Sequence, residues 1–99
     1  MEIKKNQSGN SLVINVIGRL DAATAPQLEK ELNESLATIK NLTLILVSWN
    51  MLHLLGLRVL LIAQKRMNKQ GNMTVKNVSN EIKEVLDMTG FIIFLNVEE

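Results

Sequence analysis

Cysteine is absent from this chain of 99 residues, and histidine occurs only once, at position 53. Without cysteine the protein forms neither a disulfide bond nor a thiolate nucleophile, and a single histidine excludes a zinc site built from several imidazoles. We therefore expect no metal ion and no cofactor. A chain without disulfides is also typical of the cytoplasm, which is the location that we expect.

Excess charge of one sign and long apolar runs are missing too. The 11 Lys and Arg residues nearly balance the 10 Asp and Glu residues, so the formal net charge is +1, which argues against the basic surface of a nucleic-acid-binding protein. The longest apolar run, around residues 52–63, is interrupted by His53, Gly56 and Arg58 and is shorter than the roughly 20 residues that a membrane helix needs. The N-terminus has no apolar segment typical of signal peptides. We expect a protein that binds neither nucleic acid nor membranes.

The remaining pattern is that of one small α/β domain spanning residues 1–99. A chain of about 100 residues commonly folds around a single core. Strand-like and helix-like periods alternate after an opening hairpin, which favours a sheet covered by helices. The expected elements are strand 2–7, turn 8–10, strand 11–17, helix 24–39, strand 42–47, loop 48–54, helix 55–70, strand 73–78, helix 79–88 and strand 91–97.

Capping residues mark the helix boundaries. Thr24 is expected to cap the first helix, with Pro26 in its first turn and Gln27 as the capping-box partner three residues on. Ser79 is expected to cap the last helix. At the end of the second helix, Gly71 can take the left-handed cap conformation.

Three ordered segments carry a resemblance to a known family. They are Gly18-Arg19-Leu20-Asp21, the amphipathic stretch Gly56–Gly71 with its helical spacing of apolar positions, and Asn77–Phe91. Together they resemble the STAS domains of bacterial anti-sigma factor antagonists over nearly the whole chain. The resemblance implies an α/β sandwich, in which a mixed sheet of four to five strands is packed with three main helices.

The resemblance also implies a role in partner switching. In such domains the unphosphorylated protein binds an anti-sigma factor kinase, and phosphorylation of a serine at the start of the second helix breaks the complex. A phosphate adds roughly −2 charge in the middle of the interface, which explains the switch. An anti-sigma factor kinase is therefore the expected partner. Asp21 resembles a family position near the partner surface, although it can equally end the strand and cap a turn.

The loop before the second helix departs from the family pattern at the positions that carry the switch. Ile45 stands where the family has aspartate, Val47 where it has serine, and Met51 where it has an aromatic residue. His53 replaces serine or aspartate, and Leu54 replaces the phosphorylatable serine. No phosphoacceptor is therefore expected at the family position, and we interpret the chain as an engineered or strongly diverged member.

These replacements belong to a larger apolar set near the strand ends and the start of the second helix. One interpretation is that a central parallel strand is covered on both faces, so that the set is ordinary core. The other is that a polar site has become a connected apolar surface at the place where open α/β sheets bind ligands. The comparison with the family favours the second interpretation. The expected ligand or partner site consists of Ile17, Ile45, Val47, Trp49, Met51, His53, Leu54, Leu55 and Ile93.

Two residues are weak candidates for catalysis. Lys76 could form a Schiff base with a carbonyl compound if its amine were held in an apolar setting, although a solvated lysine at the sheet edge is the simpler interpretation. His53 can exchange protons near neutral pH, and Ser48 precedes it by five residues, but no acidic residue nearby in sequence would orient the imidazole. No natural enzymatic activity is expected, and an engineered activity at the apolar site stays open.

Two classes of function remain. In the first, the chain is an interaction scaffold redesigned to bind a small apolar ligand or to carry an engineered activity. In the second, it is a phosphorylation-blind antagonist or a self-associating module. A concave site lined by Trp49, Met51 and Leu54 would favour a ligand, whereas a flat face would favour a protein partner.

Overall fold

The computed structural model of the protein describes residues 1–47 and 54–98. An antiparallel hairpin is followed by alternating helices and strands, which confirms the expected α/β class. The elements are β1 (Glu2–Ser8), β2 (Ser11–Ile17), α1 (Ala25–Ser35), β3 (Asn41–Val47), α2 (Leu54–Gln70), β4 (Asn72–Lys76), α3 (Asn80–Thr89) and the 3-10 helix η1 (Phe91–Phe94). Within the described ranges, no helix combines the length and the apolar character that a membrane crossing needs.

The sheet has the strand order β1-β2-β3-β4. β1 and β2 form the antiparallel hairpin across a tight turn that contains Gly9 at φ 59°. β2, β3 and β4 run parallel, so that Ile17 lies beside Val47 and Ile45 beside Lys76. Because these strands are parallel, the carboxyl ends of β2, β3 and β4 lie at the same edge of the sheet.

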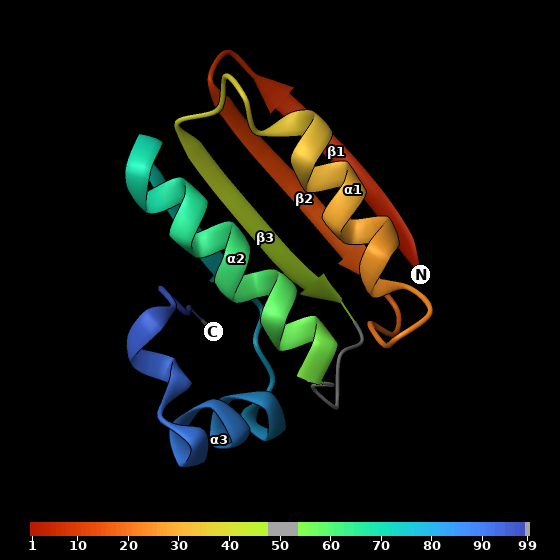
Figure 1. Ribbon diagram of the computed structural model, residues 1–99, viewed down its shortest axis with the longest axis vertical. Coiled ribbons are helices and arrows are strands. Elements are labelled where there is room, and N and C mark those ends of the chain that lie inside the picture. Colours follow the sequence, from red (N-terminus) through yellow and green to blue (C-terminus); the bar gives the residue numbers. More distant parts are fainter. Residues whose placement is uncertain (48–53, 99) are drawn as a thin grey trace.

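The two faces of the sheet differ in burial. One face is covered by α1 and α2, which lie side by side across it (Figure 1). On the other face Val13, Ile17, Ile45 and Val47 keep partial exposure. Among the described residues these four therefore lie outside the buried core beneath the helices, and the two interpretations of the whole apolar set stay predictions. The buried strand residues beneath the helices are Leu12, Ile14, Val16, Leu42, Leu44, Leu46, Met73 and Val75.

α1 is shorter than the expected helix 24–39. It ends at Ser35, and the chain turns before β3. The side-chain amide of Gln70 donates to the carbonyls of Leu36 and Ile39 at 2.6 and 2.7 Å. Two carbonyls in the connection after α1 thus accept hydrogen bonds from a residue at the end of α2, and that of Leu36 also accepts the N–H of Ile39. A tertiary contact therefore holds a turn where the sequence predicted further helix.

The start of α1 does not use the expected capping box. Thr24 has helical backbone angles, and its side chain makes no hydrogen bond to the first turn of the helix. Its hydroxyl is engaged instead in the turn around Asp21. The expectation for α3 is confirmed, because Ser79 Oγ accepts the N–H of Ile82 at 3.3 Å.

The C-terminal segment is not the expected strand 91–97. α3 ends at Thr89, and the following Gly90, with a left-handed φ of 80°, turns the chain directly into η1. The chain then meets the sheet through a parallel bridge between Val97 and Val75. The sheet of the described residues has four strands because the 3-10 turn occupies residues that a fifth strand would need.

Gly71 is required for a reason other than the expected left-handed cap, since its φ is not positive. A Cβ atom at this position would overlap the backbone carbonyl of Lys40. The N–H of Asn72 donates to the same carbonyl, and the N–H of Lys40 donates to the carbonyl of Asn10, both at 2.8 Å. The β1-β2 turn, the α1-β3 connection and the α2-β4 connection therefore meet at the other edge of the sheet.

Replacing Gly71 with alanine should lower the free energy of unfolding by about 2 kcal/mol, because the Cβ meets backbone atoms that no side-chain movement can clear. Urea unfolding followed by circular dichroism measures the loss. Gly9→Ala is the matched control, since nothing lies within 4 Å of a Cβ there and left-handed strain of about 1 kcal/mol is the expected cost. A loss at Gly71 no larger than that at Gly9 would contradict the close approach.

Candidate functional site

The carboxyl ends of β2 and β3 form one edge of the sheet. The N–H of Gly18 donates to the carbonyl of Val47 at 3.0 Å and holds the two strand ends together. On the other side of β3, the side-chain amide of Asn77 donates to the carbonyl of Leu46 at 2.6 Å. Asn77 has a positive φ of 62°, so its backbone bends away from β4 as its side chain ties β4 to β3. Open α/β sheets bind ligands at such an edge.

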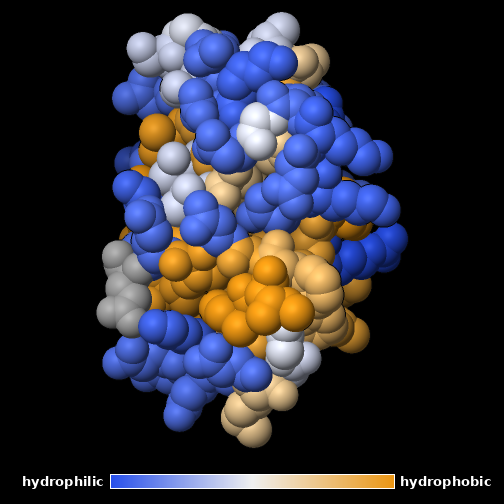
Figure 2. Space-filling model, turned by 90° about the vertical axis from the view of Figure 1, so that its left-hand side faces the viewer, coloured by the Kyte–Doolittle hydropathy of each residue, from blue (hydrophilic) through white to orange (hydrophobic). Residues whose placement is uncertain are grey.

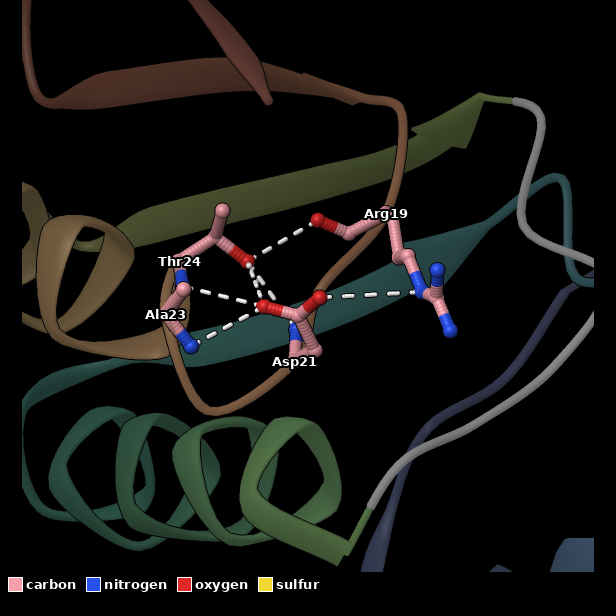
Figure 3. A network of polar contacts seen from close by, with 4 residues as sticks. All are labelled: Arg19, Asp21, Ala23 and Thr24. Carbon is pink, nitrogen blue, oxygen red and sulfur yellow. Dashed lines mark hydrogen bonds and ion pairs between the residues drawn. The ribbon is translucent and has the colours of Figure 1, made fainter.

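A compact turn follows β2 and is built around Asp21 and Thr24 (Figure 3). Asp21 Oδ1 accepts the N–H groups of Ala23 and Thr24 at 3.0 and 3.2 Å. In return, Thr24 Oγ1 accepts the N–H of Asp21 and donates to the carbonyl of Arg19, both at 2.9 Å. Arg19 Nε lies 3.6 Å from Asp21 Oδ2. Asp21 therefore caps a turn, as one of its two expected roles requires, and it positions Arg19 on the surface.

These hydrogen bonds change the acidity of Asp21. The N–H donated by Ala23 is the largest cause of a lowered pKa of the Asp21 carboxyl. Partial desolvation opposes this effect, while the hydrogen bonds from Thr24 and the charge of Arg19 support it. The net direction is a lower pKa, so the ionised carboxylate is the form that holds the turn together.

The start of α2 docks against this turn. A Cβ atom on Gly56 would lie 2.9 Å from Leu20 Cδ2, which is closer than carbon atoms approach without a shift. Leu20 is 4% exposed and belongs to the hydrophobic core. Glycine at position 56 therefore lets the start of α2 approach Leu20 in this turn closely.

The first turn of α2 is apolar. Leu54 begins the helix and is 73% exposed, while Leu55 is partly buried against the core. This turn contains no acidic residue. The sequence Leu54-Leu55-Gly56-Leu57 also carries no hydroxyl group. At the position where the family resemblance expects a phosphoacceptor, the structure therefore presents an exposed aliphatic side chain.

The structure brings part of the predicted apolar set together. Ile17 and Val47 are neighbours in the β2-β3 register, and Ile45 lies two residues before Val47 on the same outer face. Ile93 lies on η1 and is 79% exposed. The η1 segment is well separated from these strand ends in Figure 1. A single connected surface that joins all members of the set remains a prediction.

Several predicted residues lie outside the described part of the chain, namely Trp49, Met51 and the catalytic candidate His53. The other candidate, Lys76, has a half-exposed side chain whose ammonium group lies 3.7 Å from the Glu98 carboxylate. This is the geometry of a solvated lysine at a sheet edge, the simpler of its two interpretations. Among residues 1–47 and 54–98, no three His, Asp or Glu side chains are grouped so that they could hold a metal ion.

A second surface feature was not predicted from the sequence. It is a groove between α2 and η1, and its lining residues are Leu61, Gln64, Lys65, Asn68, Phe91 and Phe94. Two signals for it were present, a polar Gln64 at an apolar position of the α2 pattern and two phenylalanines three residues apart. Neither signal was sufficient, because residues 91–97 were expected to be extended.

The acidity of Asp21 gives a pH-dependent test. A carboxyl whose pKa is lowered by folding stabilises the protein above its unfolded pKa of about 3.9, and this contribution is lost as the pH falls through the lower folded value. Asp21→Asn should therefore lower the unfolding temperature at neutral pH, and its difference from wild type should shrink below about pH 4. Asp21→Ala, which also removes the acceptor, should keep a deficit at every pH. An Asp21→Asn deficit that stays constant into acid would contradict this account.

Comparisons with known proteins agree with this architecture. The family model of the STAS domain matches residues 2–99. An anti-sigma factor antagonist from Mycobacterium paratuberculosis has a crystal structure similar to this chain, with a TM-score of 0.85, 20% identity, and coverage of 98% of this chain and 84% of that chain. An anti-sigma factor antagonist (STAS) domain protein from Planctomyces limnophilus gives a TM-score of 0.85 at 16% identity, covering 98% and 89%. The Bacillus cell fate determinant SpoIIAA in its phosphorylated form gives 0.73 at 14% identity, covering 97% and 90%.

Comparison with curated protein sequences finds no match. At identities of 20% and below, the solved structures establish the fold alone. The family match extends over residues 2–99 and so includes every helix and strand described above. The chain therefore belongs to the STAS domain family.

Proposed function

We propose that this STAS domain is a protein-interaction module that binds an anti-sigma factor kinase through the 18–24 turn and the start of α2. The observation that carries the proposal is the exposed Leu54 at the first position of α2. We further propose that the chain is a strongly diverged or engineered member of its family, in which binding is not controlled by phosphorylation at position 54.

Leu54 has the character of an interface anchor. At 73% exposure it presents apolar area that a partner can remove from water. Arg19, with a side chain 75% exposed on the turn after β2, adds a cation. Because α2 packs on Leu20 at Gly56, the helix start and the turn keep their relative positions. An apolar centre with a charged neighbour is typical of protein interfaces.

Phosphorylation at the start of α2 would strongly weaken binding of the partner. A phosphate at position 54 would bring roughly −2 charge into an apolar contact. Leucine has no hydroxyl that could carry the phosphate. SpoIIAA, one of the structural relatives, has a phosphorylated form. Under this proposal, position 54 of the present chain cannot be phosphorylated.

A small apolar ligand is the second candidate. It is supported by Ile17, Ile45 and Val47, which are close together on the outer face of the sheet and partly exposed. With Trp49 and Met51, they would provide an apolar lining. These three side chains are only partly exposed, whereas Leu54 is 73% exposed, so the start of α2 offers a partner more apolar surface than this face does.

Binding is tested by titrating a purified anti-sigma factor kinase with the domain in a calorimeter. Leu54→Asp should weaken binding at least about tenfold, because it places a charge inside the apolar contact. Met88→Ala removes another exposed apolar side chain, 86% exposed on α3, and should bind as wild type does. Circular dichroism verifies that both variants fold. Equal affinity of Leu54→Asp and wild type would exclude Leu54 from the interface.

Control by phosphorylation is tested separately with the same kinase and ATP. The wild-type domain should yield no phosphate in the peptide covering residues 48–55, whereas Leu54→Ser should gain one at the start of α2. Mass spectrometry of the digested proteins distinguishes the two. Phosphate on wild-type residues 48–55 would place the acceptor on Ser48 and show that the alignment with the family is wrong.

A further inference from the structure

A groove between α2 and η1 differs from the surface proposed above. It encloses about 360 Å³ and is lined by Leu61, Gln64, Lys65, Asn68, Phe91 and Phe94. The four α2 residues follow the i, i+3, i+4, i+7 spacing of one helix face, and the phenylalanines come from η1. Figure 2 shows hydrophobic side chains gathered on this side of the molecule, below a largely hydrophilic half.

The apolar part of the groove is uncovered in the folded domain. Leu61 and Phe91 are partly buried against the core. Phe94 is 58% exposed, and its neighbour Ile93 is 79% exposed. The centres of the two phenylalanine rings lie 6.4 Å apart, so that both rings contribute to the same surface. Neighbouring exposed apolar side chains of this size mark an interaction site on a small domain.

Polar contacts hold the groove in shape. Gln64 is only 6% exposed, and its side-chain amide donates to Asn68 Oδ1 at 2.8 Å. Its Oε1 accepts the N–H of Asn96 at 3.4 Å, which ties α2 to the chain that follows η1. The hydrogen bonds of Gln64 are thus made within the domain. Lys65 is the charged residue of the lining, and it is exposed.

The charge of α2 indicates what kind of partner fits. The helix contains Arg58, Lys65, Arg66 and Lys69 and no Asp or Glu. In the part of the chain that the structure describes, none of the ion pairs involves these four residues. The helix dipole favours cations near the last turn but supplies only about half a negative charge. Most of the positive charge beside the groove is therefore available to an acidic partner.

We propose that this groove docks an amphipathic helix of a second protein, with apolar side chains over Leu61, Phe91 and Phe94 and acidic side chains beside Lys65 and Lys69. A helix laid along α2 would cover the exposed rim at Phe94 as well as the hollow, which a small molecule filling the hollow would not. The site does not include Leu54 or the 18–24 turn. One STAS domain of this kind therefore contacts two partners, or two parts of one partner.

The test uses the intact domain and a displayed library of amphipathic helices of roughly 18 residues, or about five turns. Each member carries Leu or Phe on one face and either Glu or Lys at the flanking positions. Selected peptides should carry Glu, and fluorescence anisotropy should give their affinities. Lys65→Glu should weaken a selected peptide at least about tenfold and should strengthen its Lys-flanked counterpart, a reversal that loss of structure cannot produce.

Matched variants separate the groove from the rest of α2. Phe94→Ser should weaken the peptide at least about tenfold, because it removes an apolar contact at the rim. Arg58→Glu makes the same charge change on α2 outside the groove lining, and Ile62→Ser removes an apolar side chain that is 44% exposed outside the same lining. Both should bind as wild type does, and so should Leu54→Asp. Amide shifts on peptide addition should map to residues 61–68 and 91–96.

Several results would overturn the proposal. They are selection of Lys-flanked peptides, failure to select any peptide, and equal effects of Arg58→Glu and Lys65→Glu. Sedimentation equilibrium that shows a dimer abolished by Phe94→Ser would assign the groove to a second copy of this chain instead. Decanoate that binds saturably and displaces every selected peptide would assign it to a fatty acid.

Discussion

The close packing of α2 against its neighbours is the constraint on which the rest of this structure depends. A glycine lies near each end of the helix, where a Cβ atom would be too close to a neighbour. At Gly56 the neighbour is the Leu20 side chain, and at Gly71 it is the backbone of Lys40. At its end, Gln70 also satisfies free carbonyls after α1. A displacement of α2 would therefore disturb the turn after β2, the end of α1 and the loops at the other edge of the sheet together.

The position of α2 also determines where the two proposed interaction surfaces lie. Its first residue, Leu54, follows residues 48–53 and lies on the side of the turn that Asp21 caps. Its second half contributes Lys65 and other residues to the lining of the groove. Eleven residues of helix separate these two positions, which corresponds to about 16 Å along the axis. Because one continuous helix carries both, their spacing does not depend on loop conformation.

Part of the predicted apolar set lies outside the packing between the sheet and the helices. Ile17, Ile45 and Val47 lie on the outer face of the sheet, and Leu54 lies at an exposed helix start. Apolar side chains at these positions do not enter the packing between sheet and helices, because none of them belongs to the buried core. Family membership therefore establishes the architecture, while binding depends on the chemistry of a few surface positions.

The amino-acid sequence by itself determined the features that depend on neighbouring residues: the alternation that buries Leu44 beneath the helices, the start of α3 at Ser79, and the absence of a hydroxyl at Leu54. Period and capping are local, so they can be read along the chain. Tertiary structure decided the end of α1, the need for glycine at position 71, and the groove beside η1. Each depends on atoms about 30 residues apart in sequence, such as Gln70 with Leu36 and Gln64 with Asn96. Side-chain spacing along one segment carries no information about such encounters, because they arise only when separate elements pack against one another.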